Sequence, residues 1–222
     1  MITVLLFDFD GTLVDTNELI IQSFMHTFDR FFPNRYSRED CISFIGPTLR
    51  ETFGKIAPDR AKEMIACYRA FNRENHDRYI REFPGVYETI RALHEHRFRL
   101  GIVTSKMKEM VHLGLEATRL RPFFPCIISV DEVANPKPHP ESVLKAMEFF
   151  GARPEETLMI GDNYHDILAG KNAGTKTAGV AWSLKGKDYL RQFHPDYMLD
   201  KMSDLLTIVG VEQDEKDDAV SG

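Results

Sequence analysis

Five short apolar segments constrain the fold more than any other feature of this sequence. Most of them lack the alternation of apolar and polar residues that marks a strand with one solvated face. Strands that are apolar on both sides are typical of a parallel sheet covered by helices on both faces. The five segments are Thr3 to Phe7, Leu100 to Val103, Ile127 to Val130, Leu158 to Ile160 and Ala178 to Ala181.

Helical segments separate these predicted strands, because apolar residues between them recur every three to four positions. Val143, Met147 and Phe150 follow this spacing, and Gly151 is suited to end their helix. Strand and helix in alternation, joined by right-handed crossovers, predict a doubly wound, Rossmann-like α/β core with a parallel sheet. Ligands of such sheets bind outside the carboxyl ends of the strands.

One long stretch interrupts this alternation, and its pattern is helical throughout. We therefore expect a helical cap of residues 17–82, inserted into an α/β core of residues 1–16 and 83–211. Residues 212–222 hold five acidic residues and one lysine. Such a composition predicts an acidic, disordered tail.

Composition narrows the function. The 222 residues include 28 basic and 34 acidic side chains, a net charge of −6, which argues against a protein that binds nucleic acid or an anionic membrane over its whole surface. The three cysteines are widely spaced and indicate neither a disulfide framework nor a zinc ribbon. No apolar run approaches the ~18 residues of a membrane span, and a signal peptide's basic start is missing. We expect a cytoplasmic protein.

Carboxylates follow two of the predicted strands. Asp8 and Asp10 stand directly after the first apolar segment, in the sequence Asp-Phe-Asp-Gly-Thr, and Asp162 and Asp166 follow the fourth. A solvated turn would explain the first pair, and a helix N-cap would explain Asp162. Alternatively, Asp162 and Asp166 point toward one site if Asp162 opens the following helix.

Two further polar residues fall at the same end of the predicted sheet. Thr104, followed by Ser105, ends the second apolar segment, and Lys137 lies between two prolines shortly after the third. Taken singly, Thr104 could cap a helix and Lys137 could be an ordinary loop lysine. Their placement together with the four carboxylates, in this order along the chain, favours one common site.

This ordered set resembles the motifs of the haloacid dehalogenase-like phosphohydrolase superfamily over nearly the whole chain. In having Asp10, the sequence resembles the phosphatase branch of this superfamily, because the dehalogenases lack this second carboxylate. The resemblance implies that Asp8 is a nucleophile that forms an aspartyl-phosphate, and that Asp10 protonates the leaving group and then activates water. It also implies that Thr104 binds the phosphoryl oxygens, with backbone amides near Gly11 and Ser105.

The carboxylates repel an incoming phosphate, each by on the order of 1 to 4 kcal/mol at ~4 Å. Lys137 and a divalent cation are expected to offset this repulsion. Oxygen ligands, with a phosphate oxygen and water, suit Mg²⁺. By resemblance, Asp8, the main-chain carbonyl of Asp10 and Asp162 bind Mg²⁺ directly, and Asp166 acts through water.

Longer stretches, among them Gly161 to Gly186, resemble a family of bacterial inorganic pyrophosphatases linked to the HPr kinase/phosphorylase. This resemblance implies Mg-dependent hydrolysis of inorganic pyrophosphate, a small anionic substrate. Phosphoglycolate phosphatases share the same motifs, so phosphoglycolate or another small phosphomonoester is the alternative. We expect the loop of Gly46 and Pro47 to bind substrate. Cations that could serve a compact polyanion are Arg50, Lys55, Arg69, Arg73 and Lys106, although charged residues on exposed helices are common without such a role.

A receiver-like signalling domain is the alternative from another class of protein. Receivers also place acids, a threonine and a lysine around a phosphorylated aspartate in an α/β fold. In that family the phosphorylated aspartate follows the third strand, whereas the third apolar segment here has no acid before Asp131 and Glu132. The helical insertion has no counterpart in a receiver either. Repeated catalytic turnover would distinguish the two.

Overall fold

The structure is a computed structural model, and it describes residues 1–211. The predicted acidic tail, residues 212–222, lies outside the described residues. Six parallel strands form the central sheet in the order β5-β4-β1-β6-β7-β8. Their bounds are β1 Val4–Phe7, β4 Arg99–Val103, β5 Cys126–Ile128, β6 Thr157–Gly161, β7 Lys176–Val180 and β8 Tyr197–Leu199. The five predicted segments become β1, β4, β5, β6 and β7, and β8 is an addition.

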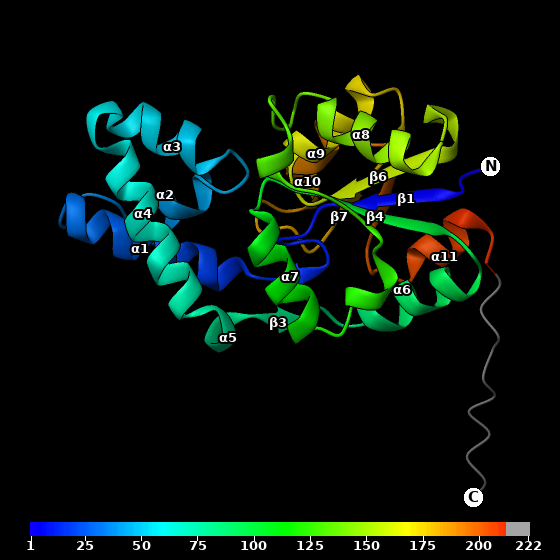
Figure 1. The fold of residues 1–222 in the computed structure, drawn as a ribbon, viewed down its shortest axis with the longest axis horizontal. Helices are drawn as coiled ribbons and strands as arrows, with labels where there is room; N and C mark the ends of the chain where they lie inside the picture. The colour runs from blue at the N-terminus through cyan, green and yellow to red at the C-terminus, as the bar shows by residue number, and fades with distance from the viewer. Residues whose placement is uncertain (212–222) are drawn as a thin grey trace, which may run out of the picture.

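Helices cover both faces of this sheet (Figure 1). On β1, Leu5 and Phe7 pack toward α6, α7 and α11, whereas Val4 and Leu6 pack toward α8 and α9. All four side chains are fully buried, and each contributes about 1.5–3 kcal/mol. These helices and α10 are α6 Val86–Glu95, α7 Lys108–Ala117, α8 Glu141–Phe150, α9 Tyr164–Asn172, α10 Lys187–Arg191 and α11 Asp204–Val209. The predicted doubly wound α/β core is therefore confirmed.

The chain reverses its direction of travel across the sheet at β1. Phe7 is in register with Ile102 of β4 on one side and with Ile160 of β6 on the other. The carboxyl ends of these three strands therefore meet at the topological switch point, where ligands of open α/β sheets bind.

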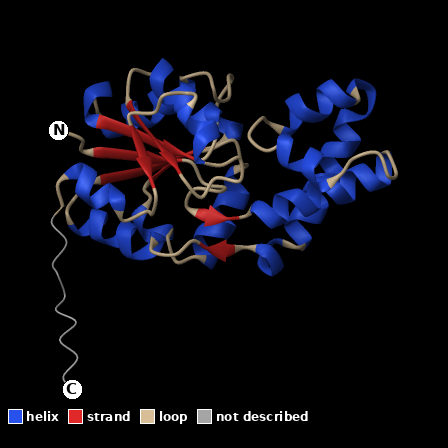
Figure 2. Cartoon of the chain, turned by 180° about the vertical axis from the view of Figure 1, so that it is seen from behind, coloured by secondary structure: helices blue, strands red, loops and turns tan. Residues whose placement is uncertain are grey.

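A separate group of helices, which we call the cap, lies beside the sheet and its flanking helices (Figure 2). Phe24, Phe28, Phe53 and Tyr68 are buried in its own apolar core, with the rings of Phe24 and Tyr68 4.9 Å apart. Side chains of Ser37 and Thr48 begin two of the short helices with capping boxes. The cap helices are α1 Asn17–Phe31, α2 Arg38–Ser43, α3 Leu49–Ile56, α4 Ala61–Glu74 and α5 His76–Tyr79.

Two short strands join the cap to the core. Strand β2, Val14–Asp15, pairs antiparallel with β3, Arg81–Glu82. The expectation that residues 17–82 are helical throughout is therefore wrong for Arg81 and Glu82, because this segment forms a strand that pairs with β2. Of the helices in residues 1–211, none combines the length and apolar character needed to span a lipid bilayer.

Candidate active site

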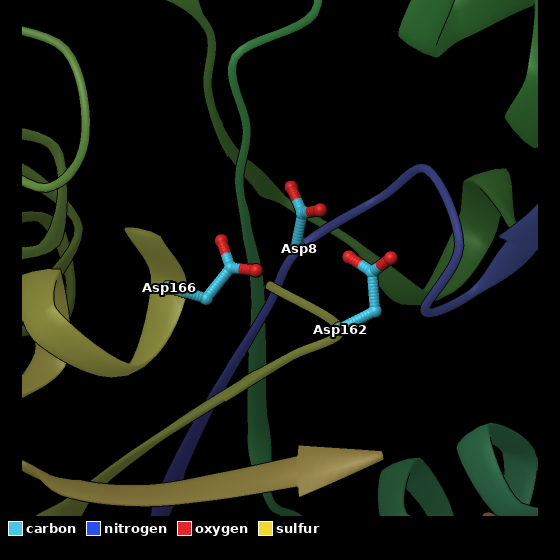
Figure 3. Close-up of side chains that lie close together, drawn as sticks. All are labelled: Asp8, Asp162 and Asp166. Atoms are coloured by element: carbon cyan, nitrogen blue, oxygen red, sulfur yellow. The ribbon is translucent and has the colours of Figure 1, made fainter. Parts of the chain in front are cut away.

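Three carboxylates converge at the switch point (Figure 3). Asp8 directly follows β1, Asp162 directly follows β6, and Asp166 lies in the first turn of α9. One oxygen atom from each lies within 4.8 Å of the others, and the three residues are 8%, 6% and 1% exposed. Asn163, rather than Asp162, is the N-cap of α9. The backbone N–H of Asn163 donates a hydrogen bond to Asp166 Oδ2 at 3.0 Å. This capping box fixes the carboxylate of Asp166 beside the other two.

Lys137 places a buried cation among these acids. Its Nζ lies 2.9 Å from Asp8 Oδ1 and 2.5 Å from Asp166 Oδ1, and donates to the Val103 carbonyl at 2.9 Å. The side chain is 3% exposed. Three acceptors account for the three N–H groups of an ammonium, so all of them are used.

Burial and mutual repulsion disfavour full ionisation of the acids. Burial raises the pKa of Asp8 from 3.8 to about 7, although the charge of Lys137 lowers it. Burial, followed by the charge of Asp8, also raises the pKa of Asp162 well above its ordinary value. Burial alone would lower the pKa of Lys137, but Asp166 and Asp8 raise it above the usual value. The centre therefore holds more negative charge than one lysine balances.

Asp10 is held away from this cluster. Its carboxylate accepts a hydrogen bond from Thr16 at 2.6 Å and pairs with Lys106, whose Nζ lies 2.7 and 3.0 Å from its two oxygens. Lys106 belongs to the loop after β4, so it serves the core site rather than the cap. The sequence does not indicate this contact of Thr16 with Asp10, because a threonine before a helix ordinarily indicates an N-cap.

The predicted phosphate-binding residues follow β1 and β4 at the same edge of the sheet as the carboxylates. Thr104 follows β4 directly and accepts the backbone N–H of Lys106 at 3.2 Å, while Ser105 is partly buried beside it. Gly11 has a positive φ of 75°, and a Cβ there would lie 2.4 Å from Asp162 Oδ2. Only glycine therefore allows this turn to approach Asp162 so closely.

The predicted cap loop reaches the edge of the site. Gly46 has a φ of 120°, and a Cβ there would lie 2.6 Å from the amide nitrogen of Asn163. Pro47 is partly buried next to it. Among the candidate cations of the cap, Arg73 pairs with Glu109 of α7 at 2.6 Å, and both side chains are exposed. Arg50, Lys55 and Arg69 are exposed.

The receiver-like alternative finds no support at β5. Asp131 accepts a hydrogen bond from the backbone of Lys108, and Glu132 pairs with the Lys108 side chain at 2.6 Å. Neither acid joins the carboxylate cluster, which is built on β1 and β6 instead.

A doubly wound parallel sheet with a carboxylate centre at its switch point and a group of helices beside it places this chain among the Rossmann-like α/β enzymes. The family model described as haloacid dehalogenase-like hydrolase matches residues 5–180, and the chain belongs to that family.

Relatives agree with this assignment. The pyrophosphatase PpaX of Anoxybacillus flavithermus is 57% identical over 210 residues, covering 95% of this chain and 98% of that protein. The pyrophosphatase PpaX of Bacillus cereus strain B4264 is 53% identical over 208 residues, covering 94% and 96%. A solved haloacid dehalogenase-like hydrolase from Bacteroides fragilis has a TM-score of 0.86 at 26% identity, covering 92% of this chain and 100% of that one. A predicted phosphoglycolate phosphatase from Haemophilus somnus has a TM-score of 0.83 at 25% identity, covering 94% and 98%.

Proposed function

We propose that this chain hydrolyses inorganic pyrophosphate to two phosphate ions in the presence of Mg²⁺. The observation that carries the proposal is the likeness, over almost the full length, to two proteins named pyrophosphatase PpaX at 57% and 53% identity. The site supports it, because a polar centre lined by acids and lysines suits a small metal-bound anion better than an apolar substrate.

Asp8 is the nucleophile in the proposed reaction. Its oxygen attacks the phosphorus of one phosphoryl group, the bridging P–O bond breaks, and the other group leaves as phosphate with a proton from Asp10. Asp10 then takes a proton from a water molecule whose oxygen attacks the aspartyl-phosphate, and the P–O bond to Asp8 breaks. The second phosphate leaves and both carboxyl groups return to their starting states. Covalent catalysis thus divides one difficult transfer into two easier steps.

Other residues hold the phosphoryl group during these steps. Lys137 contacts Oδ1 of Asp8 and offsets negative charge on this carboxylate and on a phosphoryl group beside it. Thr104 and the backbone amides near Gly11 and Ser105 stand at the carboxyl ends of β1 and β4, where they can donate to phosphoryl oxygens.

The donor set fits Mg²⁺. Buried carboxylate oxygens of Asp8, Asp162 and Asp166 lie close to one another, and burial, together with the charges of neighbouring acids, raises the pKa values of Asp8 and Asp162. A cation bound among them would offset this cost. Hard oxygen ligands without nitrogen or sulfur are those that Mg²⁺ prefers. In the proposal these three residues and the main-chain carbonyl of Asp10 hold the ion, Asp166 through water. The ion supplies positive charge that lessens the repulsion between phosphate and the carboxylates.

The division of the chain is part of the proposal. Residues 1–16 and 83–211 form the catalytic core, and residues 17–82 form a cap that moves about the β2 and β3 pair. Support comes from the separate apolar core of the cap and from the two crossings that meet at this pair. Closing brings the loop of Gly46 and Pro47 over the substrate and excludes water.

The resemblance to pyrophosphatases linked to the HPr kinase/phosphorylase extends the proposal to a cytoplasmic role. There the enzyme removes the pyrophosphate made when HPr serine phosphate is phosphorolysed. The second candidate is hydrolysis of phosphoglycolate, which is favoured by the likeness in structure to the Haemophilus somnus protein.

A substrate panel tests the proposed function. Phosphate release is measured with pyrophosphate, phosphoglycolate and p-nitrophenyl phosphate at constant free Mg²⁺. We expect the highest kcat/KM with pyrophosphate. A higher kcat/KM with phosphoglycolate would replace the proposed substrate by the second candidate.

A further inference from the structure

One backbone carbonyl joins the cap to the core beside the carboxylate cluster. The Ile45 carbonyl accepts a hydrogen bond from Asn163 Nδ2 at 3.1 Å and another from Lys185 Nζ at 2.9 Å. Because both nitrogens touch the same oxygen, Lys185 Nζ is a close neighbour of Asn163, which directly follows Asp162. Lys185 is therefore a core cation at the mouth of the site, in contact with the cap loop.

The turn that carries Lys185 is fastened to the site itself. Ser183 Oγ donates to the carbonyl of Asp162 at 2.7 Å and accepts the backbone N–H of Lys185 at 3.3 Å. The ammonium also lies 5.4 Å from the ring centre of Tyr189. Burial lowers the pKa of Lys185, whereas the charges of Asp162 and Asp166 raise it.

The other two lysines of the site have more of their N–H groups engaged than Lys185 has. Lys137 has three acceptors, and Lys106 pairs with both oxygens of Asp10. Lys185 differs from them: across residues 1–211, the Ile45 carbonyl is the one hydrogen-bond acceptor recorded for its ammonium. Two of its three N–H groups therefore remain for a ligand.

Pyrophosphate needs such a group, because it brings two anionic phosphoryl groups to the site. The proposed reaction places one of them beside Asp8 and Lys137, and the other must lie farther out, toward the cap. A phosphoryl oxygen at that position requires a charge-assisted donor. None of the candidate arginines of the cap is buried at this position, since Arg73 pairs with Glu109 and both Arg50 and Arg69 are exposed.

We infer that Lys185 binds the phosphoryl group that leaves, while it keeps one N–H on the Ile45 carbonyl. The residue thereby selects diphosphates over simple monoesters and holds the cap loop against the bound substrate. The inference rests on the proposed function, because it concerns the second phosphoryl group of its substrate.

The test compares Lys185→Met with the wild-type protein on pyrophosphate and on p-nitrophenyl phosphate, at constant free Mg²⁺. The leaving group of the second substrate has no phosphoryl group. Loss of a hydrogen bond to a charged group lowers kcat/KM for pyrophosphate by about tenfold or more, and kcat/KM for p-nitrophenyl phosphate changes much less. Lys187→Met is the matched control: Lys187 begins α10, pairs with exposed Asp200 and carries the same charge. It should leave both values unchanged.

Two conservative variants separate substrate binding from a purely structural role. Lys185→Arg keeps the charge and should restore much of the selectivity, whereas Lys185→Gln keeps a donor for Ile45 but should lose selectivity like Lys185→Met. An equal loss on both substrates would show that Lys185 only holds the cap loop, and unchanged kinetics would show no role. Either result overturns the inference. If Lys185→Met does not fold, the selectivities of Lys185→Arg and Lys185→Gln are compared in its place, and equal selectivities would overturn the inference.

A diphosphate that cannot be hydrolysed keeps this test independent of the proposed function. Methylenediphosphonate is used as an inhibitor of p-nitrophenyl phosphate hydrolysis, with inorganic phosphate as its single-group counterpart. Lys185→Met should raise the inhibition constant of the diphosphonate about tenfold and leave that of phosphate nearly unchanged. Equal changes for both would contradict the inference. Poor turnover of pyrophosphate by the wild-type protein would instead contradict the proposed function alone.

Discussion

Replacing Lys137 by methionine should destabilise the protein strongly, and by an amount that depends on pH. The change removes a buried ammonium that contacts Asp8 at 2.9 Å, Asp166 at 2.5 Å and the Val103 carbonyl at 2.9 Å. Methionine fills a similar volume but leaves these acceptors without their cation. Removing one partner of a buried ion pair costs about 3–5 kcal/mol.

The pH dependence follows from the protonation of Asp8. The pKa of Asp8 is about 7 with Lys137 present, and the charge of Lys137 lowers it, so the variant moves this pKa higher. At pH 5 the carboxyl group already holds a proton, and the loss of the ammonium costs less. At pH 8 the carboxylate must either stay charged without its partner or take up a proton, and the loss is largest.

Urea unfolding in EDTA at pH 5 and pH 8 measures both effects. We expect a loss of roughly 3 kcal/mol or more at pH 8, which corresponds to a fall in Tm on the order of 10 °C for a chain of this size. Lys176→Met is the control, because Lys176 and Asp196 form an exposed pair that contributes about 1 kcal/mol or less. A loss at pH 8 no greater than that of the control, or a greater loss at pH 5, would refute this reasoning.

Three further predictions concern the cap loop, Asp10 and the acids. Gly46→Ala should lower kcat/KM, because alanine at a φ of 120° is strained and its Cβ would collide with Asn163 of the core. Gly54→Ala is the control, because a Cβ there meets no other atom. Equal kcat/KM values for the two variants would contradict this prediction. Lys106→Met should lower kcat by about tenfold or more, because Asp10 loses its charged partner; an unchanged kcat argues against it. In EDTA, Asp8 keeps its proton up to about pH 7 in the folded protein, whereas the unfolded chain releases it near pH 3.8. The free energy of unfolding of the wild-type protein should therefore fall relative to that of Asp8→Asn between these two pH values, by up to about 4 kcal/mol. A flat difference in urea unfolding would show otherwise.

The parallel core could be predicted because strands buried on both faces are apolar throughout. β8 escaped this reasoning: it has three residues at the sheet edge, and Tyr197 and Met198 are only half-buried. β2 and β3 have two residues each, too few for any periodicity to show. Their pairing depends on the cap returning the chain to its starting point, which is a property of the whole fold.

The convergence of Asp8, Asp162 and Asp166 could be predicted for a different reason. Parallel strands place their carboxyl ends at one edge, so polar residues that follow several strands must meet there. The partners of each acid could not be predicted in this way. Lys106 and Asp10 are 96 residues apart in the chain, and nothing in either neighbourhood indicates that they pair.

The contact between cap and core carries still less signal in the sequence. Lys185 is 140 residues from Ile45 and binds its backbone carbonyl, which every residue type possesses. Side-chain identity therefore says nothing about the acceptor, and the contact follows only once both lobes are folded. Gly46 is the one visible trace of it, because a Cβ there would collide with Asn163.

Phosphate release from pyrophosphate by wild type, Asp8→Asn and Asp59→Asn, measured side by side with excess Mg²⁺, tests the central claim most directly. Asparagine matches aspartate in shape but is no nucleophile, and Asp59 is an exposed residue of the cap. Wild type and Asp59→Asn should each release two phosphates per pyrophosphate at similar rates, while Asp8→Asn releases none above background. Undiminished release by Asp8→Asn, or no release by the wild-type protein, would contradict hydrolysis of pyrophosphate by attack of Asp8.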